Sequence, residues 1–174
     1  MEKHERMFKE KLEANGILYQ QAITSGRKFG NTWASKRNDI FGAFDFEIIT
    51  KYGKIIFIQI TSASNSSARK KKVYDNFISK LETDYIPHNI YVLSYKEKKQ
   101  KGKKRKITLW HLSYYDIQFG YWVDVSLSYK GNVENWYSLD AALFHILNSF
   151  FIPEEHKRGR INKKSNIKRK NNNL

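Results

Sequence analysis

Residues 39–61, Asp-Ile-Phe-Gly-Ala-Phe-Asp-Phe-Glu-Ile-Ile-Thr-Lys-Tyr-Gly-Lys-Ile-Ile-Phe-Ile-Gln-Ile-Thr, carry the pattern of a two-stranded hairpin. One strand is predicted at residues 44–50 and its partner at 55–61, joined by the turn Lys-Tyr-Gly-Lys. Antiparallel pairing places Asp45, near the start of the first strand, opposite Gln59, near the end of the second. Gln59 interrupts an apolar run, so its polar side chain needs a partner.

An acidic oxygen and an amide oxygen that converge at the end of a hairpin suit Mg²⁺, which prefers oxygen ligands and keeps several waters. Glu47, two residues beyond Asp45, lies on the same side of the strand and is a weaker ligand candidate. The alternative interpretation is that Asp39 and Asp45 are turn residues and that Gln59 faces solvent.

The composition indicates a polyanionic partner. The 174 residues include 32 Lys and Arg against 17 Asp and Glu, which gives a formal charge of +15. Such a charge attracts nucleic acid strongly at low salt. The absence of cysteine excludes disulfides and thiolate metal sites. The apolar runs are too short to span a bilayer and no apolar signal region follows the first residues, so a cytoplasmic protein with no membrane partner is expected.

Three basic segments are predicted to lie outside the core. Residues 25–38 are polar and rich in small and basic residues, which predicts a surface loop. Residues 96–106 contain eight Lys or Arg and one Glu, and are interpreted as an exposed hairpin tip. Residues 156–174 contain eight Lys or Arg and no acid, so their composition predicts a flexible tail. The predicted organisation is a single domain at 1–153 followed by a basic tail at 154–174.

The remaining periodicities predict an α/β fold with a mixed central sheet flanked by helices. Helices are expected at residues 2–15, 68–83 and 139–151, and further strands at 17–24, 89–95, 107–112 and 121–128. The buried face of the second helix is expected to carry Val73, Phe77, Ile78 and Leu81.

Residues 5–95 resemble the PD-(D/E)xK nuclease superfamily and, within it, the archaeal-type Holliday-junction resolvases. Glu5-Arg6 precedes Gly16 by a spacing similar to that of the resolvases, and Ser25-Gly26 stands where their Ser-Gly loop would be. Asp45 matches the first acid of the motif.

The second half of the motif departs from the superfamily pattern. Gln59 and Thr61 take the places of its second acid and its lysine. This chain is more similar to a variant of the superfamily motif, which reads Asp-(x)-Phe-Gly-x-x-Asp, then Gln-x-Thr-Ser and Asn-x-x-x-Arg-x-x-Lys. Its residues here are Asp39, Asp45, Gln59, Thr61, Ser62, Asn65, Arg69 and Lys72. In this alignment Asp39 would restore the missing negative charge, and Arg69 or Lys72 would replace the lysine.

The resemblance implies a restriction-endonuclease-like core and a metal-dependent endonuclease that hydrolyses DNA phosphodiester bonds, with Mg²⁺ or Mn²⁺ as cofactor. It extends to a Holliday-junction resolvase or a related nuclease of DNA repair and recombination, with branched DNA as partner, acting near the nucleoid or encoded by a phage or mobile element. Symmetric cutting of a junction would require a homodimer.

The residues assigned by the resemblance fall into three groups. The implied metal ligands are Asp45, Gln59, Asp39 and Glu5, and the implied catalytic residues are Asp45, Gln59, Thr61, Arg69 and Lys72. The basic segments around them predict nucleic-acid contacts from Ser25, Arg27, Lys28, Trp33, Lys36, Arg37, Lys70 and Lys71.

Several alternatives remain open at this stage. Glu5 is also interpretable as an exposed helix acid, and the run 69–72 as a solvated or DNA-backbone-facing basic turn. The rival functions are a restriction-type endonuclease, a non-catalytic nucleic-acid-binding protein that retains the nuclease fold, and an RNA-binding basic protein.

Overall fold

The computed structural model describes residues 2–29, 32–82, 89–100, 102, 106–129 and 132–148. For residues 25–29, 32–37, 128, 129 and 132 only the backbone is described. The chain divides into two compact units, Met1–Ala142 and Leu143–Leu174. All elements discussed below, except the last helix, lie entirely in the first unit.

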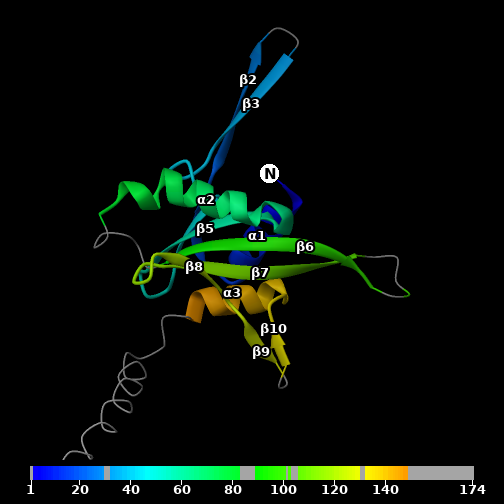
Figure 1. Cartoon of the computed structure of the whole chain (residues 1–174). Coiled ribbons are helices and arrows are strands. Elements are labelled where there is room, and N and C mark those ends of the chain that lie inside the picture. The colour runs from blue at the N-terminus through cyan, green and yellow to red at the C-terminus, as the bar shows by residue number, and fades with distance from the viewer. Residues whose placement is uncertain are drawn as a thin grey trace, which may run out of the picture. The chain divides into compact units, whose positions relative to one another are not determined.

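A six-stranded mixed sheet forms the centre of the first unit (Figure 1). Its order is β1-β4-β5-β6-β7-β8, and only the β5–β6 pair is parallel. The strands are β1 (Leu18–Gln21), β4 (Phe46–Ile49), β5 (Ile55–Ser62), β6 (Ile90–Lys99), β7 (Lys106–Asp116) and β8 (Tyr121–Asp124). The helices are α1 (Lys3–Ala14), α2 (Ser66–Asn76) and α3 (Leu139–Asn148), with 3₁₀ turns η1 (Ala63–Asn65) and η2 (Ile78–Lys80).

The predicted hairpin is confirmed as β4 and β5. Phe46 pairs with Ile58 and Ile49 with Ile55. Gly53 in the turn has φ +76°, a left-handed conformation that favours glycine. The register places Asp45, just before β4, beside the second half of β5, where its backbone N–H donates to the carbonyl of Ile58 at 3.0 Å.

The helices α1 and α2 pack on opposite faces of this sheet. Phe8 of α1 packs edge-on against Phe46, with ring centroids 5.1 Å apart. Val73 of α2 belongs to a buried cluster with Phe57 and Val92. Phe46 lies opposite Ile58, which is adjacent to Phe57, and neighbouring strand residues face opposite sides. The predicted α/β class, a mixed central sheet flanked by helices, is therefore confirmed.

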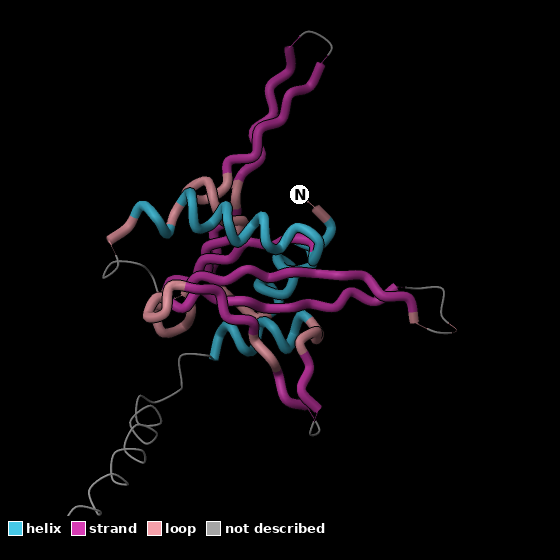
Figure 2. The backbone as a smooth tube through the Cα atoms, in the orientation of Figure 1, coloured by secondary structure: helices cyan, strands magenta, loops and turns pink. Residues whose placement is uncertain are grey.

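The prediction of a surface loop at residues 25–38 is wrong. This segment belongs to a separate antiparallel hairpin of β2 (Ile23–Phe29) and β3 (Thr32–Asn38), which Figure 2 shows leaving the central sheet. The strand predicted at 17–24 is interrupted at Ala22, whose N–H donates to the carbonyl of Asp45 at 2.8 Å. A two-stranded ladder satisfies its backbone hydrogen bonds by itself, and the polar sequence of this segment gives no alternating pattern.

Three further boundaries differ from the prediction. Much of the basic run 96–106 is strand, because β6 continues to Lys99 and β7 begins at Lys106. The strand predicted at 121–128 is divided into β8 and β9 (Leu127–Tyr129), and β9 pairs with β10 (Asn132–Glu134). The helix predicted at 68–83 is instead α2, followed by η2. The predicted tail at 154–174 lies outside the described residues.

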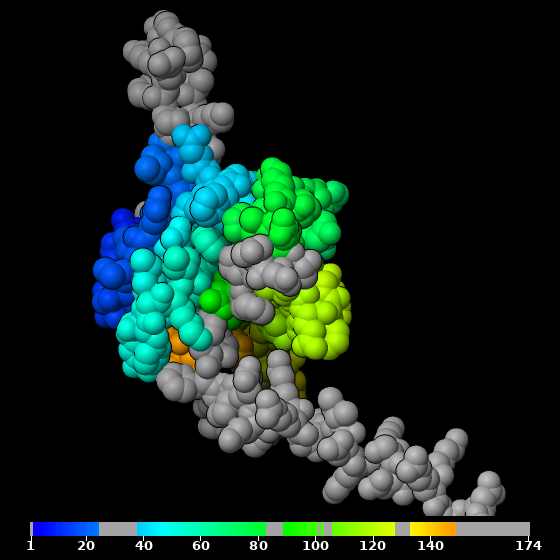
Figure 3. Space-filling view, turned by 90° about the vertical axis from the view of Figure 1, so that its left-hand side faces the viewer, coloured from blue at the N-terminus to red at the C-terminus, as the bar shows by residue number. Residues whose placement is uncertain are grey.

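Figure 3 looks at the first unit from the side where two sheet turns reach the surface: the β4–β5 turn in turquoise and the β7–β8 turn in yellow-green. These turns carry the exposed aromatic residues Tyr52 and Phe119. Among the described residues, no helix combines the length and the apolar character needed to cross a membrane.

Candidate active site

Most of the predicted metal-binding and catalytic residues line one cavity of about 130 Å³ beside the second half of β5. Those from the predicted metal and catalytic sets are Glu5, Asp39, Asp45, Gln59, Thr61 and Arg69. The motif residues Ser62 and Asn65 also line it, together with Glu2, Ile60 and Tyr95. The cavity thus gathers side chains from α1, the β3–β4 connection, β5, β6 and α2.

Asp45 and Gln59 are in direct contact, as the hairpin register predicts. Gln59 Nε2 donates to Asp45 Oδ2 at 2.5 Å, and the Ile60 N–H donates to the same oxygen at 2.7 Å. Asp45 is buried and Gln59 is 2% exposed, so the interpretation of Gln59 as a solvent-facing residue is wrong. Charge-assisted hydrogen bonds of this kind hold a buried carboxylate in one orientation.

The side-chain oxygen of Gln59 accepts no hydrogen bond from the atoms that the structure describes. Its Nε2 contacts two oxygens, Asp45 Oδ2 and the Ile60 carbonyl at 2.9 Å, and this fixes which end of the amide is the nitrogen. Gln59 Oε1 is buried and has no hydrogen-bond partner among the atoms that the structure describes. A buried acceptor without a partner destabilises a fold by ~1–3 kcal/mol. A water or a cation bound directly beside this oxygen would satisfy it.

Glu5 reaches the cavity from α1. It is 4% exposed, so its interpretation as an exposed helix acid is wrong. Tyr95 of β6 lies on the same cavity wall, because the parallel β5–β6 register pairs Ser62 with Tyr95. Burial raises the pKa of Tyr95, and the nearby Glu2 and Glu5 raise it further, so its hydroxyl remains a donor at neutral pH.

The two basic candidates of α2 occupy different places. Arg69 lines the cavity directly. Lys72 forms an ion pair with Asp39, whose carboxylate lines the cavity while Lys72 is not among the lining residues. The charge of Lys72 therefore acts on the cavity through Asp39, whereas Arg69 is itself one of the lining residues.

Acidic residues dominate the charged lining of the cavity. Four carboxylates, from Glu2, Glu5, Asp39 and Asp45, line it, against the charges of Arg69 and of the Lys72 that pairs with Asp39. In the described part of the chain, no three His, Cys, Asp or Glu side chains come together as a metal-binding group. A cation here would need the Gln59 oxygen and waters to complete its shell, a mode that Mg²⁺ favours.

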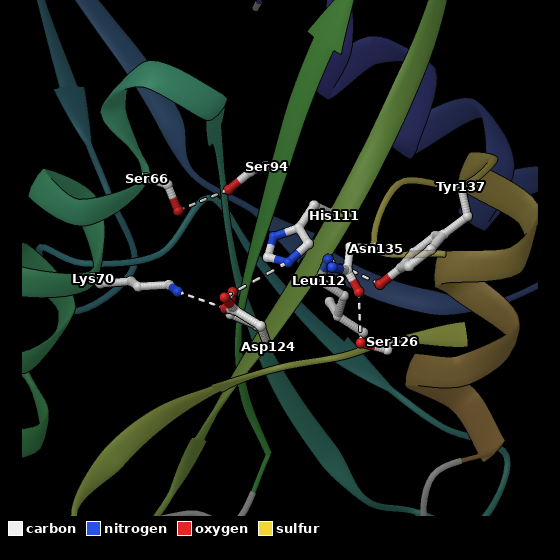
Figure 4. A network of polar contacts seen from close by, with 10 residues as sticks. Ser66, Lys70, Ser94, His111, Leu112, Asp124, Ser126, Asn135 and Tyr137 are labelled. Atoms are coloured by element: carbon white, nitrogen blue, oxygen red, sulfur yellow. Dashed lines mark hydrogen bonds and ion pairs between the residues drawn. The ribbon is translucent and has the colours of Figure 1, made fainter. Parts of the chain in front are cut away.

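The position of α2 is fixed by a polar network on the adjacent strands (Figure 4). Lys70 Nζ donates to Asp124 Oδ1 at 2.9 Å, and Ser113 Oγ donates to the same oxygen at 2.6 Å. Ser66, at the start of α2, hydrogen-bonds Ser94 of β6 at 2.9 Å. Lys70 is therefore bound against the sheet, while its neighbour Lys71 is 76% exposed and pairs with Asp75.

Burial and hydrogen bonding shift the pKa values of Asp124 and His111 in this network and of the nearby Tyr137. Burial raises the pKa of Asp124, but the hydrogen bonds from Ser113 and Lys70 outweigh it, and the pKa lies below its ordinary value. Burial lowers the pKa of His111, whose ring faces Asp124, so His111 is neutral at pH 7. Burial raises the pKa of Tyr137 to about 12, and its hydroxyl accepts the N–H of Leu112 at 2.9 Å. This network stabilises the fold beside the cavity.

The other predicted nucleic-acid contacts lie on the separate hairpin. The register of β2 and β3 pairs Ser25 with Lys36, Lys28 with Trp33, and Thr24 with Arg37. The structure describes only the backbone of the six predicted contacts on this hairpin, which are Ser25, Arg27, Lys28, Trp33, Lys36 and Arg37.

Comparison of the chain with protein-family models, with curated proteins and with solved structures finds no match.

Proposed function

We propose that this chain is a Mg²⁺- or Mn²⁺-dependent endonuclease that hydrolyses DNA phosphodiester bonds. The observation that carries the proposal is the joint lining of one small cavity by Glu5, Asp39, Asp45 and the buried amide of Gln59, beside Arg69. The chain has a formal charge of +15, yet the charged lining of this cavity is mainly acidic and would repel a phosphate. A phosphate would bind there only if a cation lay between it and the carboxylates.

A bound divalent cation would polarise the scissile phosphate and lower the pKa of an attacking water. Asp45, Gln59 and the carboxylates of Glu5 and Asp39 are the residues that would hold it. Arg69 would stabilise the negative charge that grows on the phosphate oxygens in the transition state. Thr61 and Tyr95 line the same cavity, and their hydroxyl groups would orient the water or the phosphate.

The β2–β3 hairpin supports DNA as the substrate. Its strands contain Arg27, Lys28, Lys36 and Arg37 and no acidic residue. Asp39 follows β3 directly, so the hairpin ends at the rim of the cavity. Phosphate contacts from such an arm supply affinity without sequence specificity. Action on branched DNA, as in a Holliday-junction resolvase, is part of the proposal and would require a homodimer for paired cuts.

The proposal is tested by incubating the purified chain with linear duplex, single-stranded DNA, RNA and a four-way junction. We expect cleavage of a DNA substrate in Mg²⁺ or Mn²⁺ and none in chelator. Symmetric nicks at the junction would support the resolvase assignment, whereas fixed fragments from linear duplex would support a restriction-type enzyme. If no substrate is cut under any of these conditions, the nuclease proposal fails.

A non-catalytic nucleic-acid-binding protein is the second candidate. One observation favours it: Asp45 Oδ2 is already satisfied by Gln59 Nε2 and the Ile60 N–H, without any metal. This function predicts DNA binding that is equally tight in Mg²⁺ and in chelator, with no cleavage.

Replacement of Arg69 by Ala should lower the single-turnover cleavage rate by ~10²–10³-fold, the effect of removing one preorganised group that stabilises transition-state charge. The dissociation constant for DNA should change far less. Lys71→Ala is the matched control, since it removes the same charge from the same helix at a side chain that is exposed and paired with Asp75. Equal effects of the two substitutions on rate would mean that Arg69 only attracts the DNA backbone.

A further inference from the structure

A second cavity adjoins the candidate active site and has no assigned role. It has a volume of about 400 Å³, within the usual range for small-molecule pockets of ~300–1,000 Å³. Its wall includes Gln20, Ile23, Asn38, Asp39, Phe41 and Glu47. Asp39 lines both cavities, so a ligand in the second one lies next to the proposed position of the scissile phosphate.

Phe41, on this wall, has an unusual backbone conformation. Its φ is +53°, and among the described residues it is the only one other than glycine with a positive φ. A left-handed conformation costs a residue with a side chain ~1–2 kcal/mol. The turn is nevertheless closed by hydrogen bonds from Gly42 N–H to the Asp39 carbonyl at 2.9 Å and from Ala43 N–H to the Ile40 carbonyl at 3.0 Å. Strain of this kind is retained mainly at functional sites.

The strained turn holds an aromatic ring at the surface. The Phe41 ring is 5.4 Å from that of Phe77 and 5.8 Å from that of Phe57, so its position is supported from one side. Phe41 is nevertheless 60% exposed. An exposed ring of fixed position is a platform on which a nucleobase stacks.

The same wall carries the polar side chains of Gln20, Asn38 and Glu47. Gln20 of β1 lies directly opposite Glu47 of β4 in the antiparallel register. Amide groups of Gln20 and Asn38 both donate and accept hydrogen bonds, and the carboxylate of Glu47 accepts them. A carboxylate acceptor pairs with the amino groups of bases such as cytosine.

We propose that the second cavity binds one unpaired nucleobase of the DNA strand, stacked on Phe41, while an adjacent phosphate of that strand occupies the candidate active site. The substrate class is thus DNA with an unpaired base: a single strand, a bulge or a branch that carries a single-stranded flap. The position of the phosphate rests on the proposed function, whereas the binding of the base does not require cleavage. The basic β2–β3 hairpin, which starts at Ile23 on this wall, favours a nucleic acid over an acidic or neutral ligand.

The test compares two duplexes of the same sequence, one with a single bulged 2-aminopurine and one with that base paired. Both are bound in chelator, so that no strand is cut. The wild type should bind the bulged duplex about 5- to 150-fold tighter, which is the affinity equivalent of the ~1–3 kcal/mol per base that stacking contributes, and should quench the 2-aminopurine fluorescence.

Phe41→Asn should lose this preference and the quenching, while its affinity for the paired duplex remains unchanged. Asparagine tolerates the left-handed conformation, so the turn is kept. The matched control is Phe119→Asn, which removes a 63% exposed ring from the β7–β8 turn. Ile23→Ser, at an exposed position of the cavity wall, provides a second variant that leaves the turn untouched and should weaken bulge binding.

Equal affinity of the wild type for both duplexes, or a preference that survives in Phe41→Asn and Ile23→Ser, would overturn the proposal. If these variants halve the particle mass measured by sedimentation and leave DNA binding unchanged, the second cavity would be a contact with a second copy of the chain, and the proposal would fail. Bulge preference without cleavage in any metal would leave this proposal intact and remove only the nuclease.

Discussion

Asp45→Asn is expected to lower metal-dependent cleavage by at least ~10²–10³-fold, because a bound cation contributes several kcal/mol of transition-state stabilisation and the substitution removes a charged ligand. The remaining Asn oxygen can still accept the hydrogen bonds that Gln59 Nε2 and the Ile60 N–H give to Asp45 Oδ2. The fold should therefore persist. DNA affinity should stay the same or increase, because one negative charge that repels phosphate is lost.

The measurement is single-turnover cleavage in Mg²⁺ together with DNA binding in chelator. Asp75→Asn serves as control, because Asp75 lies on α2 and pairs with the exposed Lys71 away from the cavity. A variant Asp45→Asn that cuts as fast as the wild type would show that the β4–β5 hairpin does not form the active site. A melting temperature close to that of the wild type would confirm that any loss concerns chemistry and not folding.

The centre of the site was predictable because its two main residues belong to one hairpin. The turn at Gly53 and the apolar run of β5 set a register, and the register places Asp45 against Gln59. The β5–β6 contact is a parallel pairing, which no local spacing encodes. Tyr95 was therefore missed, although the strand that carries it was predicted. Glu2 was missed because an acid at the start of a helix is common on exposed surfaces.

Two structural features could not be read from periodicity. The strands β2 and β3 form a sheet of their own, and their sequence has no alternation of apolar residues that would reveal them. In residues 121–128 the alternation continues through Val125 to Leu127. Val125 N–H still donates to the carbonyl of Leu112 in β7, but Leu127 already belongs to the separate β9–β10 pair. The left-handed Phe41 was also unpredictable, since the adjacent Gly42 accounts for a turn by itself.

Gln59→Glu should make the stability of the protein strongly dependent on pH and on divalent cations. The new carboxylate would replace an amide nitrogen that lies 2.5 Å from Asp45 Oδ2, at a position that is 2% exposed. Two buried carboxylates at this distance share one proton, so the pKa of the pair rises above the value of an unfolded glutamic acid, ~4.3. The penalty is absent below that pH, grows as the pH rises, and is complete above the raised pKa.

At pH 8 in chelator we expect a loss of ~3–5 kcal/mol, the usual effect of an uncompensated buried charge, and a fall in melting temperature on the order of 10 °C. Mg²⁺ should restore much of this loss if the cavity holds a cation, because a ligand that binds only the native state stabilises it. Gln118→Glu adds the same charge to the exposed β7–β8 turn and should melt like the wild type at either pH. Destabilisation that Mg²⁺ does not relieve would mean that the cavity is a remnant without metal affinity, which favours the non-catalytic DNA-binding protein. An unchanged melting temperature at pH 8 without metal would show instead that Asp45 and residue 59 are not in contact in solution.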